Sequence, residues 1–190
     1  NQIKRDKHIQ LLKTLEINNH IIVFQDECVI QEDLVRTHGR CEKGRRLIGL
    51  KTATKHNKTG IIAGYTKLPN EKQYLYISPF YFNDNCDTLL FNFWLENIFI
   101  PEVKILQQLY PNNPISLVID NVPYHKSNKT VALCNENQIN LVFQSPYSPD
   151  LNPIEPSWNT AKNDIRNCSY IPITFHEKLT KALLSRTWNI

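Results

Sequence analysis

The sequence predicts an α/β sandwich in which a mixed β-sheet carries helices on both faces. Three short apolar runs, at 21–24, 115–119 and 139–143, are typical of strands buried on both faces. Segments with apolar residues at helical spacing precede, separate and follow these runs. The length of 190 residues, with 41% hydrophobic and 21% charged residues, fits a single globular domain spanning the whole chain, 1–190.

Helical and extended patterns alternate along the chain. In the first half, the expected elements are a leading helix or linker within 1–20, a strand at 21–27, a hairpin of two strands between about 45 and 68, and a short strand at 74–78. They are followed by a helix at 87–109, a strand at 115–120, a helix from about 127 to 137, a strand at 139–143 and a helix from 156 onward. Gly60 is expected to supply the hairpin turn. Pro101 is expected to bend or break the long helix, whose wide apolar arc, including Phe93 and Trp94, predicts that it is largely buried.

Charge and cysteine content narrow the class of protein. The formal net charge of +4 and the pI near 8.8 permit a polyanionic partner without requiring one. No apolar run approaches the roughly 18 residues of a membrane helix, so we expect no membrane association. The cysteines are odd in number and include no C-x-x-C pair, which argues for reduced thiols in an intracellular protein and against a disulfide framework or a zinc site. They are Cys28, Cys41, Cys86, Cys134 and Cys168.

Two of the predicted buried strands end in aspartates. Asp26 closes the first strand, and Asp120 closes "ISLVID". Open α/β sheets bind ligands at the carboxyl ends of their strands, so parallel pairing of these two strands would bring both carboxylates within reach of one ion. The two charges would otherwise repel each other and raise at least one pKa, a conflict that a divalent cation removes. The alternative is that both are turn or capping acids, and Glu27 is expected to be structural or to support the site.

Glu155 has two interpretations. Asn152, Pro153 and Glu155 fit an N-cap, a proline at the first helical position and a capping-box glutamate. Pro156 argues against this, because it has no N–H and biases the preceding residue away from the helical region. A helix that begins at Pro156 would leave the carboxylate of Glu155 free at its mouth, available to hold a metal. Both interpretations stay open at this point.

Three segments together resemble the catalytic domain of mariner-superfamily transposases, in the branch that includes bacterial insertion-sequence enzymes. They are "VFQDE" at 23–27, "LVIDNVPYHKS" at 117–127 and "YSPDLNPIEPSWNTAKNDIR" at 147–166. This family carries an Asp, Asp, Glu triad with 34 residues between the second Asp and the Glu, and 34 residues separate Asp120 from Glu155 here. Relatives usually carry a polar residue after the Glu, so the proline that follows it here departs from the pattern.

The resemblance implies a ribonuclease-H-like fold with a mixed five-stranded sheet and helices on both faces. It implies that Asp26, Asp120 and Glu155 hold Mg²⁺, for which Mn²⁺ can substitute, and that they catalyse cleavage of DNA at transposon ends and strand transfer into target DNA. Two such ions about 3.5–4 Å apart would serve the attacking and leaving oxygens. Mg²⁺ favours carboxylate oxygens, which suits these three acids better than the scattered cysteines and histidines.

Other positions that match the family pattern, and nearby basic residues, are further candidates. Trp158 is expected to anchor the last helix in the core, and His125 either lies near the scissile phosphate or is a structural histidine. Lys162 either meets a phosphate or is a solvated surface lysine. Among the basic stretches, the loop at 38–46 is the strongest candidate for binding DNA, with a solvated face as the alternative. The candidate DNA contacts are Arg45, Arg46, His125, Lys126, Lys162 and Arg166.

The resemblance also implies partners and a location. The DNA would be the transposon's terminal inverted repeats and target DNA at TA sites, bound by a homodimer or larger assembly in a bacterial cytoplasm or nucleoid, or in the nucleus of a eukaryote. Residues 1–20 are too short for the helix-turn-helix region that reads transposon ends in this family, so we expect that region to be absent. Two other functions stay open: an inactive DNA-binding or assembly domain, and a ribonuclease or resolvase on the same fold.

Overall fold

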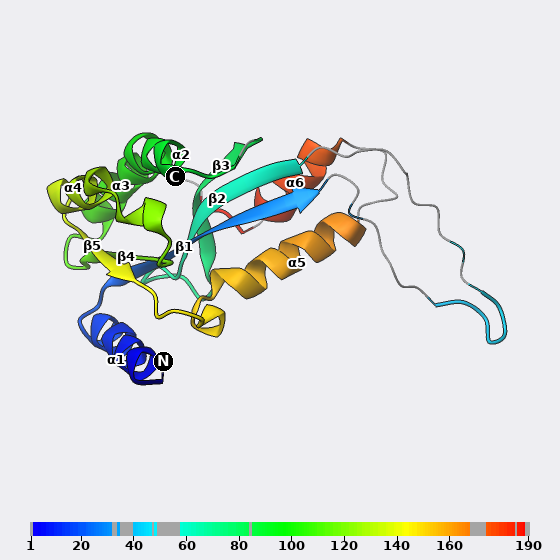
Figure 1. Cartoon of the computed structure of the whole chain (residues 1–190), viewed down its shortest axis with the longest axis horizontal. Coiled ribbons are helices and arrows are strands. Elements are labelled where there is room, and N and C mark those ends of the chain that lie inside the picture. The colour runs from blue at the N-terminus through cyan, green and yellow to red at the C-terminus, as the bar shows by residue number, and fades with distance from the viewer. Residues whose placement is uncertain are drawn as a thin grey trace.

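A mixed five-stranded sheet forms the centre of the fold, with strand order β3-β2-β1-β4-β5 (Figure 1). The computed structural model describes residues 2–31, 34, 40–46, 48, 58–83, 85–167, 174–184 and 186–188. The strands are β1 (Ile21–Gln31), β2 (Lys58–Thr66), β3 (Leu75–Phe82), β4 (Ile115–Ile119) and β5 (Ile139–Phe143). The α-helices are α1 (Gln2–Ile17), α2 (Thr88–Trp94), α3 (Ile100–Leu109), α4 (Asn128–Glu136), α5 (Ile154–Asn167) and α6 (Phe175–Leu184).

β1 connects the two halves of the sheet because it has one antiparallel and one parallel neighbour. It pairs antiparallel with β2 over Val23–Gln31 and parallel with β4 over Ile21–Phe24. β2 also pairs antiparallel with β3, and β4 also pairs parallel with β5. The mixed sheet predicted from the sequence is therefore confirmed, with an antiparallel half and a parallel half that meet at β1.

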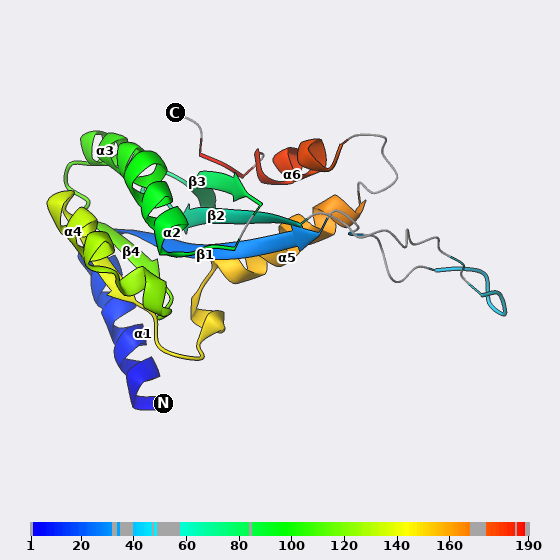
Figure 2. The same ribbon diagram turned by 45° about the horizontal axis from the view of Figure 1, so that its top comes forward.

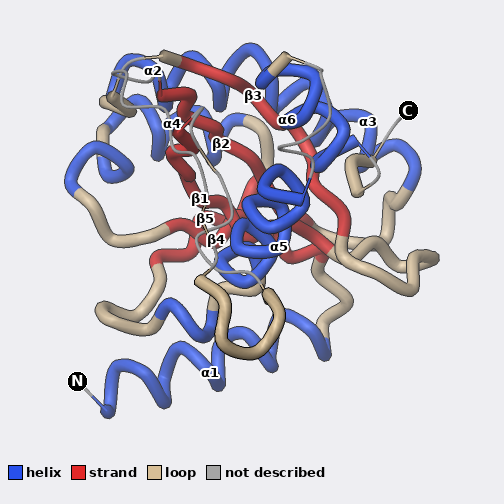
Figure 3. Tube along the Cα trace, turned by 90° about the vertical axis from the view of Figure 1, so that its right-hand side faces the viewer, coloured by secondary structure: helices blue, strands red, loops and turns tan. Residues whose placement is uncertain are grey.

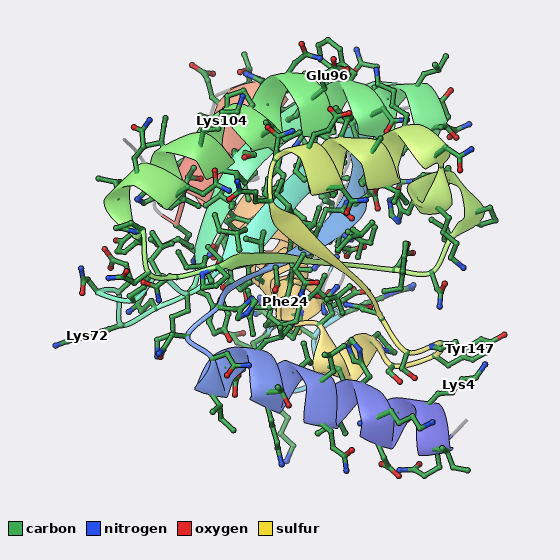
Figure 4. All side chains as sticks on the ribbon, turned by 90° about the vertical axis from the view of Figure 1, so that its left-hand side faces the viewer. Lys4, Phe24, Lys72, Glu96, Lys104 and Tyr147 are labelled. Carbon is green, nitrogen blue, oxygen red and sulfur yellow. The ribbon has the colours of Figure 1, made fainter. Side chains whose placement is uncertain are left out.

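Helices cover both faces of the sheet (Figure 2), and the side chains of β1 alternate between these two layers. Ile21 and Val23 join the apolar cluster that contains α2 and α3. Ile22 and Phe24 point to the other face and pack with Leu15 of α1, and Figure 4 shows Phe24 between the sheet and α1. Farther along this second face, α5 and α6 lie side by side and pack over β1 and β2 (Figure 3). Coverage of both faces explains why this part of β1 is apolar at every position.

Two expectations about the first strands are wrong. β1 does not end at Asp26 and Glu27 but continues to Gln31, because β2 goes on pairing with it after the β1–β4 ladder has ended. Gly60 does not form a turn but lies inside β2, where a Cβ would come within 2.3 Å of the Phe82 ring, so glycine leaves room for that ring. The first half of the expected hairpin falls mostly outside the described residues.

The expected long helix is interrupted by a π-helical turn at Leu95–Phe99, between α2 and α3. Pro101 lies at the start of α3, where its missing N–H costs little. The irregularity predicted near this proline is confirmed, but it takes the form of a π turn just before it. Phe93, expected to be buried, is 49% exposed, whereas Trp94 is fully buried.

The second half of the chain follows the predicted order closely. β4, α4 and β5 match the expected boundaries to within one residue, and Ser127 caps α4 by accepting a hydrogen bond from the Thr130 N–H. α6 has no counterpart among the expected elements. None of the helices that the structure describes is both long and apolar enough to cross a membrane.

Candidate active site

Asp26 and Asp120 both lie just beyond the end of the β1–β4 ladder. The last pair of this ladder is Phe24 of β1 and Val118 of β4, so each aspartate comes two residues after a paired residue. Asp26 is still inside the ladder with β2, opposite Ala63, whereas Asp120 directly follows β4. The parallel pairing expected for the two aspartate-bearing strands is confirmed.

Glu155 approaches this region from the start of α5. The helix begins at Ile154 and not at Pro156, because Asn152 caps it: its Oδ1 accepts a hydrogen bond of 3.3 Å from the Ile154 N–H. The Asn152 N–H donates to the carbonyl of Pro149 at 2.9 Å, so it does not need the Glu155 carboxylate of a reciprocal capping box. The expected helix start is therefore wrong, while the side chain of Glu155 is exposed in the first turn.

A cavity of about 610 Å³ opens where these elements meet. Asp26, Asp120 and Glu155 all line it. The rest of its described wall comes largely from the segments that follow β4 and β5, at 121–122 and 144–149. The structure thus brings to one cavity the three carboxylates that the sequence singled out, each from a different element.

The surroundings of Asp26 disfavour its negative charge. Burial raises the pKa of Asp26 to about 7, and the charges of Glu155 and Glu27 act in the same direction. Nε1 of Trp158 donates a hydrogen bond of 3.1 Å to Oδ2 of Asp26, which offsets part of this effect. Trp158 is 2% exposed and its ring stacks on Tyr76, so the expected core anchor also orients a carboxylate of the cavity.

The fully buried imidazole of His125 joins the carboxylates of Asp120 and Glu27. Its Nδ1 lies 2.6 Å from Oδ1 of Asp120, and its Nε2 lies 3.2 Å from Oε1 of Glu27. Burial acts to lower the pKa of His125, but the two carboxylates outweigh it and raise the pKa to about 9, so the ring is a cation at neutral pH. In return, although burial opposes it, the hydrogen bond and charge of His125 lower the pKa of Asp120.

This geometry favours the structural interpretation of His125. Both ring nitrogens are occupied by carboxylates, and His125 is not among the described residues that line the cavity. Glu27 faces the layer opposite to Asp26, where the Cys86 thiol also donates to its Oε1 at 3.5 Å. Glu27 therefore supports Asp120 through the imidazole, as expected of a residue that supports the site.

The candidate DNA contacts on α5 and near α4 lie at different distances from the cavity. Lys126 is exposed and lines it, with Nζ 5.6 Å from the centre of the Phe143 ring. Lys162 is half-buried on α5, where its ammonium interacts with the Cys28 thiol, so it is not a fully solvated lysine. Arg166, one turn farther along α5, hydrogen-bonds a neighbouring asparagine on the same helix.

Arg45 and Arg46 lie elsewhere. Both are exposed in the described segment 40–46, and Arg45 pairs with Glu42 at 3.0 Å. Figures 1 and 2 show this segment well away from the sandwich. The structure does not bring these two arginines to the cavity.

The carboxylates fit a hard divalent cation in their chemistry. Mg²⁺ prefers carboxylate oxygens, and a cation would relieve the repulsion that helps to raise the pKa of Asp26. In the described part of the chain, no three His, Cys, Asp or Glu side chains stand close enough together to hold a metal ion as they are. Binding would therefore need side-chain movement, for which the exposed Glu155 has the freedom.

Solved transposase structures share this fold. The Mos1 mariner paired-end complex with Mg has a TM-score of 0.61 at 16% identity, covering 98% of this chain and 62% of that chain. The Mos1 paired-end complex with the left transposon end gives 0.59 at 16% identity, covering 96% of this chain and 57% of that chain. The Mos1 catalytic domain with Raltegravir and Mg gives 0.52 at 15% identity, covering 98% and 94%. The fold is therefore ribonuclease-H-like, and the chain spans about three fifths of the longer transposase chains.

Sequence comparison gives the family. No curated protein matches the chain significantly. Residues 21–174, however, match the DDE superfamily endonuclease family over most of the chain. The match runs from the start of β1 to beyond α5 and includes all the carboxylates of the cavity. This chain therefore belongs to the DDE superfamily endonucleases.

Proposed function

We propose that this chain is the catalytic domain of a mariner-superfamily DNA transposase, which cleaves DNA at transposon ends and transfers the freed strand into target DNA. The observation that carries this proposal is the cavity lined by Asp26, Asp120 and Glu155, which come from three different elements. Membership of an endonuclease family supports phosphodiester chemistry. The similar Mos1 structures include complexes with transposon-end DNA, which supports DNA as the substrate.

The proposed cofactor is Mg²⁺, with Mn²⁺ as a substitute, held by Asp26, Asp120 and Glu155. Similar Mos1 structures have been solved with Mg and with Mn. When bound, such ions activate the attacking water or 3′-hydroxyl and stabilise the leaving oxygen. The three acids therefore serve as ligands, and the surrounding residues set their charge and orientation.

Each of the two aspartates is held by hydrogen bonds from different residues. Trp158 donates a hydrogen bond to Oδ2 of Asp26 and thereby restrains that carboxylate through one oxygen. Oδ1 of Asp120 accepts from His125 at 2.6 Å and from the Val122 N–H at 3.3 Å, so Asp120 is fixed through one oxygen. Such support holds reactive groups in a productive arrangement before substrate arrives. Lys126 is exposed on the same wall, and in this proposal it meets a DNA phosphate.

Finer assignments rest on the sequence pattern. The segment at 148–155 and the 34 residues between Asp120 and Glu155 support the branch that includes bacterial insertion-sequence enzymes. The DNA would then be terminal inverted repeats and TA target sites, handled by a homodimer or larger assembly. The corresponding location is a bacterial cytoplasm or nucleoid, or a eukaryotic nucleus.

The direct test is nicking of duplex DNA by the purified chain with Mg²⁺ or Mn²⁺. We expect the wild type to nick DNA and Asp120→Asn to lose nicking while its circular dichroism spectrum stays that of a folded protein. Asp6→Asn is the matched control, because Asp6 is exposed on α1 outside the cavity. It should nick like the wild type.

Three outcomes would redirect the assignment. Equal nicking by wild type and Asp120→Asn would refute the catalytic role of the cavity. Binding of DNA without cleavage under every divalent cation would identify an inactive DNA-binding or assembly domain. Preferential cleavage of the RNA strand in an RNA–DNA hybrid would identify a ribonuclease.

A further inference from the structure

A salt bridge joins the first turn of α1 to the turn that precedes α5. Nη1 of Arg5 donates a hydrogen bond of 2.8 Å to Oδ1 of Asp150, and Nη2 donates one of 2.5 Å to Oδ2. Two parallel bonds of this kind fix the relative orientation of the two groups as well as their distance. The residues are 145 positions apart in the sequence, and Figure 1 shows the yellow segment that leads into α5 passing close to the N-terminal end of α1.

The rest of α1 is packed against the sheet. His8, one turn after Arg5, is 5% exposed, and so is Leu15 near the end of the helix. Leu15 packs in an apolar cluster with Phe24 of β1. β1 also carries Asp26, two residues after Phe24. Arg5 therefore projects from a helix that is fixed to the strand of one cavity carboxylate, and it reaches the segment that precedes another.

Short-range hydrogen bonds connect Asp150 to Glu155. Asp150 is the middle residue of the 3-10 turn Pro149–Leu151. Asn152 donates its N–H to the first carbonyl of this turn at 2.9 Å, and its side chain caps α5 by accepting from the Ile154 N–H. The Glu155 N–H in turn donates to the Asn152 carbonyl at 3.2 Å. A displacement of Asp150 would therefore move the residues that set where α5 begins.

Glu155 depends on this backbone support more than the two aspartates of the cavity do. Each aspartate accepts a hydrogen bond from a buried ring, as described above. Among the described residues, none pairs with the carboxylate of Glu155, which is exposed in the first turn of α5. The position of this carboxylate is therefore set by the start of the helix, and a change there is passed on to it.

We propose that Arg5 and Asp150 form a positioning pair that holds the start of α5, and with it Glu155, in place for metal binding. Neither member of the pair is among the described residues that line the cavity, so the pair acts through the backbone and not by contact with a metal. The inference rests on the proposed function in one respect, namely that Glu155 is a metal ligand. It gives α1 a part in the geometry of a site to whose described wall α1 contributes no residue.

The test measures two properties of the full chain, at a temperature where every variant is folded. Amide hydrogen exchange at Ile154 and Glu155, followed by NMR in the metal-free protein, reports how firmly the start of α5 is held. Calorimetry with Mn²⁺ reports the affinity of the site, which loss of stability alone does not change in a folded protein. Arg5→Ala should raise both exchange rates and lower the affinity for Mn²⁺, each by roughly two- to fivefold, the size expected for an exposed pair.

Charge reversal separates the pair from either residue alone. Arg5→Asp and Asp150→Arg should each act at least as strongly as Arg5→Ala, whereas the double variant that combines them should recover most of the wild-type exchange rates and affinity. Arg5→Lys keeps the charge but cannot make two parallel bonds, so it should recover only part. In about 1 M salt the effect of Arg5→Ala should shrink, because the side chains of the pair are 30% and 61% exposed and therefore screened.

Lys13→Ala is the matched control. It removes the same charge from an exposed position of the same helix, and it should leave the exchange rates and the affinity for Mn²⁺ unchanged.

The outcomes separate this inference from the proposed function. Exchange rates that do not change in Arg5→Ala, or a double variant that recovers neither property, would overturn the positioning pair even if the wild type nicks DNA. Faster exchange without weaker Mn²⁺ binding would also overturn it, because Glu155 would then not depend on the pair. If the wild type binds no Mn²⁺ while exchange follows the expected pattern, the link between α1 and α5 is upheld and the metal role of Glu155 is refuted.

Discussion

Asp26 and Asp120 line the same cavity, each two residues beyond the last pair of the parallel ladder, yet their surroundings shift their pKa values in opposite directions. Burial raises the pKa of Asp26 to about 7, aided by the charges of Glu155 and Glu27. Asp120 is also partly buried, which alone would raise its pKa, but the hydrogen bond and charge of His125 lower it. One carboxylate carries its own buried counter-cation, and the other has a tryptophan N–H.

This difference shows how the cavity is prepared for a cation. The protein secures the negative charge of Asp120 through the chain to His125 and Glu27. It leaves the charge of Asp26 largely uncompensated. A divalent cation from solution would therefore relieve Asp26 more than Asp120, and the two positions should respond differently when they are altered.

Removing the buried, positively charged imidazole of His125 should have the largest effect on the free energy of unfolding. His125→Leu leaves Glu27 and Asp120 without their partner, and we expect the free energy of unfolding to fall by about 2–3 kcal/mol near pH 6, below the full cost of breaking a buried pair because Asp120 is 42% exposed. The pKa of His125 is raised to about 9, so its contribution is complete below the ordinary pKa of about 6.5 and is lost as the pH rises through 9. Urea unfolding from about pH 6 to pH 10 measures this, and a constant difference between the proteins would show that the ring is not charged.

Neutralising each aspartate should shift stability in opposite directions. In the metal-free protein near pH 8, Asp26→Asn removes an uncompensated buried charge and should raise the free energy of unfolding by about 1–2 kcal/mol. Asp120→Asn removes the counter-charge of His125 and should lower it by about 1 kcal/mol, a modest amount because Asp120 is 42% exposed. Urea titration measures both, with Asp6→Asn expected within about 0.5 kcal/mol of wild type. If both substitutions changed the free energy of unfolding in the same direction, the difference between the two aspartates described above would be contradicted.

Cation binding should follow the titration of Asp26. Because its pKa is raised to about 7, the carboxyl must lose a proton before it binds a cation. Affinity for Mn²⁺ should rise by up to about tenfold per pH unit below 7 and level off above it, as measured by calorimetry. Without a cation, the stability contributed by protonated Asp26 is present near pH 4 and is lost as the pH rises through 7. An affinity that does not change between about pH 5.5 and pH 8 would count against this role.

The smallest expected effect concerns the tryptophan. Trp158→Phe keeps an aromatic ring against Tyr76 but removes the N–H that bonds to Asp26. The pKa of Asp26 should then rise further, because this hydrogen bond lowers it, and the free energy of unfolding should fall by about 1 kcal/mol. Carboxyl-carbon NMR titration of both proteins checks the pKa. An unchanged value would mean that burial and repulsion alone set it.

Much of the fold could be predicted because buried strands have a clear local pattern. β4 is buried at every position, as its apolar run predicts, because both faces of the sheet are covered there. β5 matches its run in extent, but it is an edge strand with Asn140 exposed, so it is not buried on both faces. The continuation of β1 beyond Asp26 could not be predicted, because it depends on pairing with β2. The place of Gly60 beneath Phe82 depends in the same way on a neighbouring strand. For α6 a local signal was present, since Thr174 and Glu177 form a capping box with bonds of 2.7 and 3.2 Å.

In the site, the three carboxylates could be singled out from their place after apolar runs and from the family pattern. The residues that hydrogen-bond to these carboxylates could not be predicted, because Asp26 and Glu27 are neighbours in sequence but face opposite layers of helices. Only the three-dimensional arrangement shows that Glu27 supports Asp120 through His125.

The π-helical turn at Leu95–Phe99 has a consequence for changes in length. It holds one residue more than an α-helical turn, and each residue rotates a helix by about 100°. Trp94 before it and Val103 after it are both fully buried, although in a regular helix nine residues would turn them about 180° apart. The wider turn therefore absorbs one extra residue without moving Val103 out of the core. A single deletion within the turn should restore a regular helix with both side chains still facing the core, about 80° apart. Over evolution, this segment should tolerate the loss of one residue more readily than a regular helical turn does.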